Sequence, residues 1–178
     1  MQEPTHILAG VIIERSVQLT CGRRAWTFLL TAALAFLSHG LLDKLANFTY
    51  HPPNANFHDP FWVIYHSCVL AATVLFLCIW WRTFKLGIAF AMLPDLDWVI
   101  MHGQEIFHFR IPFYQRPHMH DLLGLIFDRT RPFSLLKIPS HRHNPWACLY
   151  EAALVLLMLG AIYLLTKPQP GPISPSRQ

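Results

Sequence analysis

Three long apolar stretches constrain this chain more than any other feature, because each is long enough to cross a bilayer. They cover residues Ala25–Leu45, 61–81 and 146–166, and a helix of about 20 apolar residues spans the hydrocarbon core of a membrane. Only 13% of the residues are charged, whereas charged residues make up about a quarter of a typical soluble domain. The sequence therefore predicts an integral membrane protein.

Two shorter apolar blocks leave the number of membrane segments open. Residues 7–13 are followed at once by Glu14 and Arg15, which is typical of an interfacial helix or of a helix packed inside a bundle. Residues 86–101 are interrupted by Pro94 and two aspartates, which indicates a short, tilted or re-entrant helix. We expect an all-α fold, a small integral membrane helical bundle with three or four membrane segments.

The remaining chain is polar. Residues 103–144 form a histidine-rich connection that we do not expect to span the membrane, with a short helix expected around residues 122–127. Residues 1–167 are expected to form a single membrane-embedded domain, and the proline-rich tail at 168–178 is expected to be disordered. No pair of the four cysteines has CxxC spacing, so neither a disulfide framework nor a thiolate zinc site is expected.

The charge balance indicates lipid rather than nucleic acid as the partner. The formal net charge is +4, and basic residues beside membrane segments usually reflect topology and anionic headgroups. No compact basic stripe with interleaved aromatic residues is present, so we expect no nucleic-acid binding.

A histidine and an aspartate near the end of the first long apolar stretch form the strongest local motif. His39 and Asp43 are four residues apart in Ser38-His39-Gly40-Leu41-Leu42-Asp43, so on a helix both side chains share one face. Ionisable groups within a membrane segment usually face a bundle interior or a watery cavity. The pair can hold a divalent metal or act as a base with its orienting partner, or it can be a plain interfacial pair.

A second motif places two carboxylates inside an apolar block, in Leu93-Pro94-Asp95-Leu96-Asp97-Trp98. Two buried, ionised carboxylates repel each other, and a bound cation or a nearby histidine would relieve that repulsion. Asp95 can instead be an ordinary helix-start residue after Pro94.

Further histidines add candidates of decreasing strength. In Arg116-Pro117-His118-Met119-His120-Asp121 the His-x-His spacing can supply one or two ligands, or belong to a polar surface loop. His6 lies early in an apolar helix, where a lone histidine is more often a satisfied polar residue. His66 and Glu151 are weaker candidates, which are considered because an ionisable residue inside a membrane segment is often functional.

These motifs together resemble the family of membrane-bound, predicted metal-dependent hydrolases, which are small bacterial inner-membrane proteins. The similar segments are Pro4-Thr5-His6, Ser38 to Asp43, Pro94 to Asp97, and Gln115 to His120. The His/Asp helix comes second in this chain, whereas the family usually places it late. The family's Thr-His-Ser element is replaced here by Met119-His120-Asp121.

The resemblance implies a divalent metal, with zinc favoured, and hydrolysis of an ester or phosphoester bond in a lipid or lipid-linked substrate. The expected ligands are His39, Asp43, Asp95 and His120, with His6 as an auxiliary ligand. Asp97 is expected as a ligand or general base, and Arg116 as a partner for a phosphate. The expected location is the bacterial inner membrane. The alternative is a non-enzymatic membrane protein, either an assembly subunit or a metal or proton carrier, in which His66 and Glu151 would matter more.

Overall fold

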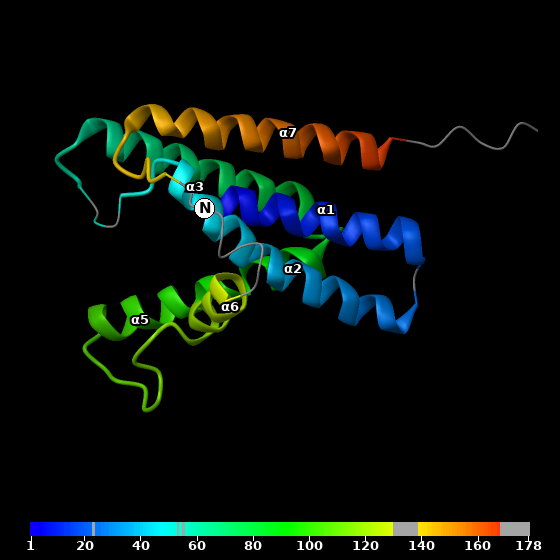
Figure 1. The fold of residues 1–178 in the computed structure, drawn as a ribbon, viewed down its shortest axis with the longest axis horizontal. Coiled ribbons are helices and arrows are strands. Elements are labelled where there is room, and N and C mark those ends of the chain that lie inside the picture. Colours follow the sequence, from blue (N-terminus) through cyan, green and yellow to red (C-terminus); the bar gives the residue numbers. More distant parts are fainter. Residues whose placement is uncertain (23, 53, 55, 130–138, 168–178) are drawn as a thin grey trace, which may run out of the picture.

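The described part of the chain is a small bundle of helices without strands (Figure 1). The computed structural model describes residues 1–22, 24–52, 54, 56–129 and 139–167. The predicted disordered tail at 168–178 lies outside these residues. The α-helices are α1 (Glu3–Cys21), α2 (Ala25–Leu45), α3 (Pro60–Trp80), α4 (Lys85–Met92), α5 (Leu96–Ile106), α6 (His118–Arg129) and α7 (Cys148–Thr166). Short 3-10 turns are η1 (Ala46–Phe48), η2 (Leu93–Asp95) and η4 (Pro145–Ala147).

Three helices of the described chain are long and apolar enough to cross a membrane. They are α2 with η1, α3, and η4 with α7. The outward faces of α3 and α7 carry large exposed apolar side chains such as Leu70 and Leu157. Water would disfavour such surfaces, whereas lipid tails suit them. The prediction of an all-helical bundle is confirmed, with three candidate spans.

Local sequence fixes where the spans begin. Pro60 occupies the first turn of α3, where a missing N–H costs nothing, and the Asp59 side chain accepts a hydrogen bond from Phe61 N at 2.9 Å. In the same way Asn144 Oδ1 accepts from Trp146 N ahead of α7. α2 ends and α3 and α7 begin at one end of the bundle (Figure 1).

α1 lies inside the bundle, which resolves the open alternative for residues 7–13. It contacts α2, α3, α4 and α7, and Ile7, Leu8 and Val11 are buried in the core. The two charged residues after this run form hydrogen bonds with backbone groups at the ends of neighbouring helices. Glu14 Oε2 accepts from Gly87 N in the first turn of α4 at 2.8 Å, and Arg15 Nε donates to Leu165 O near the end of α7.

The apolar block at 86–101 is broken into two helices. α4 packs against α1 and α2, with Gly10 and Gly87 at its crossing with α1, where a Cβ on either would overlap the other's backbone. Pro94 lies in the η2 turn that follows, and α5 begins directly after this turn as a separate helix. The expected short helix near 122–127 is part of α6. These breaks bring Asp95 and α6 to the end of α2.

Candidate metal centre

Five predicted ligands, drawn from four elements, meet at one point of the bundle. They form two groups that share His39, namely His6, His39 and Asp43, and His39, Asp95 and His120. Within each group the candidate ligand atoms lie within 4.8 Å of one another. Imidazole nitrogens and carboxylate oxygens are ligands of zinc and related divalent metals. Either group could therefore hold a metal ion.

His39 is fully buried and has its tautomer fixed by the backbone. Its Nδ1 lies 2.7 Å from the carbonyl oxygen of Ala91 in α4. A carbonyl only accepts, so Nδ1 carries the hydrogen and Nε2 is left facing the cluster. This Nε2 lies 3.1 Å from Asp43 Oδ2 and 3.6 Å from Asp95 Oδ1. The i,i+4 spacing in the last turns of α2 places the first of these partners.

His120 is oriented in the same way by Asp97. His120 Nδ1 lies 3.1 Å from Asp97 Oδ2, which also accepts from the backbone N–H groups of Met119 and His120 at the start of α6. Asp97 Oδ1 accepts from the Tyr114 hydroxyl. Although burial opposes ionisation, these hydrogen bonds hold the pKa of Asp97 below its usual range. Asp97 is therefore a carboxylate that holds His120, with both oxygens occupied.

The Nε2 atoms of His39 and His120 consequently point at each other, 3.3 Å apart. Because each Nδ1 keeps its hydrogen for another acceptor, two lone pairs meet here unless a proton or a cation lies between them. Trp98 Nε1 also donates to His120 Nε2 at 3.1 Å, so a metal at this nitrogen would replace that hydrogen bond.

Two buried groups of the cluster lack hydrogen bonds within the described chain. They are both ring nitrogens of His6 and Oδ2 of Asp95. His6 stacks on His39 with ring centroids 3.9 Å apart, and its Nε2 lies 3.4 Å from Asp43 Oδ1. Burial lowers the pKa of His6 to about 3 and raises that of Asp95 to about 6. Buried, unsatisfied polar atoms cost about 1–3 kcal/mol each. A bound cation would remove this cost for the lone pair of His6 and for Asp95 Oδ2.

The cluster is buried on one side and open on the other. His6 and His39 are inaccessible, whereas the side chains of Asp43 and Asp95 are 34% and 28% exposed. The Met1 amino group lies 3.0 Å from Asp43 Oδ1. These residues lie at the end of the bundle where α3 and α7 begin, so the open side is near one face of any membrane that the three spans cross.

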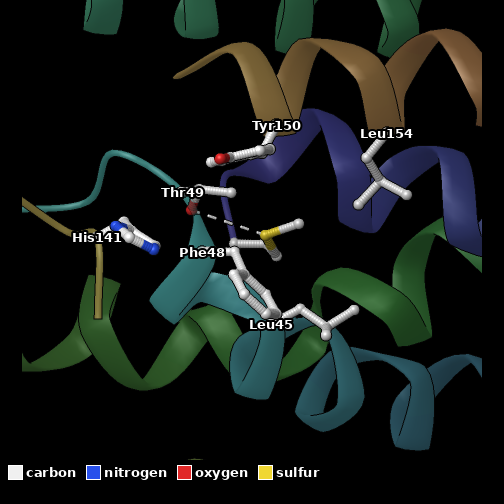
Figure 2. A pocket seen from close by; sticks show the side chains of 7 residues that line it. Leu45, Phe48, Thr49, His141, Tyr150 and Leu154 are labelled. Atoms are coloured by element: carbon white, nitrogen blue, oxygen red, sulfur yellow. Dashed lines mark hydrogen bonds between the residues drawn. The ribbon is translucent and has the colours of Figure 1, made fainter. Parts of the chain in front are cut away.

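A cavity of about 350 Å³ lies next to the cluster and is drawn in Figure 2. Met1 links the two, because it lines the cavity and its amino group bonds Asp43. The lining of the cavity is mainly apolar, and Figure 2 shows polar atoms of Thr49, His141 and Tyr150 on one side of it. The lining residues are Met1, Leu45, Phe48, Thr49, His141, Tyr150 and Leu154.

Other predicted residues lie away from the cluster. Arg116 pairs with Asp121, Nε to Oδ2 at 3.5 Å, and both side chains are exposed. His66 stacks on Trp62 and bonds its carbonyl oxygen within α3. None of the hydrogen bonds or ion pairs found among the described residues joins these side chains to the cluster.

Glu151 has a structural place. It accepts from the Tyr65 hydroxyl at 2.6 Å and from Gln2 N at 2.9 Å. It thereby ties α7 to α3 and to the start of α1, close to the cluster but outside it.

Sequence reasoning missed two residues that support the cluster. Trp98 follows Asp97 directly, and its indole N–H, a hydrogen-bond donor next to a candidate motif, could have marked it as a supporting residue. Tyr114 lies 17 residues from Asp97, and no local pattern marks it.

Fold and site together define a class: a small α-helical protein with three candidate membrane spans and a buried histidine–aspartate cluster that could hold a metal. No family model, curated protein or solved structure matches the chain. The resemblance to metal-dependent hydrolases therefore stays a prediction that rests on the short motifs.

Proposed function

We propose that this protein is a membrane-embedded, metal-dependent hydrolase that cleaves an ester or phosphoester of a lipid or lipid-linked substrate. The observation that carries the proposal is the pair of Nε2 atoms of His39 and His120, turned toward each other and toward Asp43 with both tautomers fixed. Such an arrangement suits a bound cation, because it turns two lone pairs toward one point.

The proposed ligands are His39, Asp43, Asp95 and His120, with His6 completing the second group. A bound zinc ion would act as a Lewis acid and lower the pKa of water to about 7. Ala91 O and Asp97 keep the two imidazoles in the tautomer that leaves Nε2 without a hydrogen. The second oxygen of Asp95, which has no partner among the described residues, is placed to hold a proton during the reaction.

A lipid substrate is supported by the position of the cluster. The open side lies near the end of three candidate spans, and the adjoining cavity has an apolar lining that suits an acyl chain. The inner membrane of a bacterium is the proposed location, on the resemblance alone. The role of Arg116 toward a phosphate stays a prediction, because its guanidinium pairs with Asp121 instead.

The test is metal content followed by activity. Protein purified in mild detergent should hold about one divalent ion per chain, measured by elemental analysis, and hydrolyse lipid esters or phosphoesters in mixed micelles. Chelation should abolish the activity and Zn²⁺ should restore it. Metal-free protein that gains no activity from Zn²⁺ or Mn²⁺ would refute the proposal, and cation flux in liposomes would then favour the carrier alternative.

A further inference from the structure

The segment that begins at the last residue of α5 exposes apolar side chains to an unusual degree. Residues 106–113, which we call the aromatic loop, read Ile-Phe-His-Phe-Arg-Ile-Pro-Phe. Phe113 is 94% exposed and Phe107 is 74% exposed, and Ile106, Phe109 and Ile111 are exposed as well. A run of exposed apolar side chains of this kind marks a contact with a partner or with lipid.

The aromatic loop is held in shape by hydrogen bonds. Gln104 clamps it from both sides, because its Nε2 donates to Tyr114 O at 2.8 Å and its Oε1 accepts from Ile111 N at 2.6 Å. His118 Nε2 bonds Phe113 O at 2.6 Å. The apolar side chains are thus presented by an ordered loop.

Two backbone positions in the loop are strained. His108 has φ 53° and Phe113 has φ 70°, a region that residues other than glycine rarely adopt. Strain of this kind is unfavourable and persists where the surroundings impose it. At Phe113 it accompanies the most exposed aromatic ring among the described residues.

The basic charge in and next to the aromatic loop favours an anionic partner. Arg110 and Arg116 lie in or next to it, and no Asp or Glu occurs between Glu105 and Asp121. Aromatic side chains mixed with basic ones suit the interface of an anionic bilayer, where rings sit at headgroup level and cations meet phosphates. α5 and α6 lie beside the end of the bundle where α3 and α7 begin (Figure 1), which is the level of one membrane face.

We propose that the aromatic loop inserts into the headgroup layer of the anionic membrane that its own spans cross. The loop continues into Tyr114, whose hydroxyl bonds Asp97, the carboxylate that holds His120. Two hydrogen-bonded side chains, Tyr114 and Asp97, therefore connect the proposed lipid contact to His120 in the cluster. The proposal depends on membrane insertion of the spans and not on metal binding or hydrolysis.

The insertion of the aromatic loop can be tested by measuring the membrane depth of spin labels on the full chain in lipid nanodiscs. In a background with the four free cysteines replaced by serine, a nitroxide is attached at Phe113→Cys, at Glu105→Cys as the water control, and at Leu157→Cys on the outer face of α7 as the lipid control. At 113 the label should be more accessible to oxygen than to a water-soluble nickel complex, as at 157, and the order should reverse at 105.

Lipid charge gives a second arm. In discs that contain phosphatidylglycerol, Arg110→Glu should move the label at 113 toward water, with little change in pure phosphatidylcholine. High nickel accessibility at 113, equal to that at 105, would overturn the proposal. Low accessibility to both reagents would also overturn it, because it would indicate a protein partner or a second copy on the loop. Neither readout depends on bound metal.

Discussion

The Nε2 atoms of His39 and His120 face each other at 3.3 Å although the two residues lie 81 positions apart in the chain. His39 is pinned by the carbonyl oxygen of Ala91 and His120 by the carboxylate of Asp97. Both partners accept hydrogen from Nδ1, so neither ring can turn its lone pair away without losing a buried hydrogen bond. Two acceptor nitrogens are thereby held close together, an arrangement that a bound cation would stabilise.

Removing a proposed ligand should remove the metal. Asp43→Asn and His120→Gln should each lower zinc affinity by more than about 100-fold, the upper end of the loss seen when an outer partner of a ligand is removed. Isothermal titration in detergent measures this. His102→Gln on exposed α5 is the matched control and should bind like the parent chain. Unchanged affinity in both cluster variants would exclude the proposed centre.

Asp97 should act through His120. Asp97→Asn should weaken metal binding about 10–100-fold, because the amide is a poorer acceptor for His120 Nδ1–H. Tyr114→Phe should have a smaller effect in the same direction, since it removes one of several hydrogen bonds to Asp97. Asp121→Asn, on the exposed face of α6, is the control. If the asparagine at 97 instead abolished turnover with unchanged metal affinity, the general-base role would be favoured.

Bound metal should stabilise the fold. A ligand present at 100 times its Kd stabilises a protein by about 2.7 kcal/mol when it binds only the folded state. The Tm of the metal-loaded protein should therefore fall on chelation and recover with Zn²⁺. Asp43→Asn should show no such shift. A Tm that responds equally to zinc in the parent and in this variant would point to adventitious binding elsewhere.

The crossing of α1 and α4 should tolerate only glycine. A methyl group at Gly10 or at Gly87 would overlap the backbone of the other residue, and backbone cannot move aside as a side chain can. Gly10→Ala and Gly87→Ala should each destabilise the protein by about 1–3 kcal/mol or more. Gly160→Ala, where a Cβ meets nothing within 4 Å, should be neutral or stabilising. Thermal denaturation in detergent compares the three.

The sequence determined the spans nearly to the residue. α2 has the predicted bounds, and α3 and α7 begin or end within about two residues of them. The reason is that hydropathy, length and capping are local properties. The i,i+4 pairing of His39 with Asp43 was readable for the same reason, because helix geometry alone places both on one face.

Only the tertiary structure decided which helices pack together and which distant residues contact the cluster. The position of α1 inside the bundle, and the use of Glu14 and Arg15 at the ends of other helices, depend on which helices surround it. The sequence gives no reason to treat Asp97 differently from Asp95. In the structure, Asp95 faces the cluster, whereas Asp97 bonds Nδ1 of His120 on the side away from the cluster. Contacts such as those of Tyr114 and Ala91 join residues distant in the chain, and such contacts exist only once the bundle has packed.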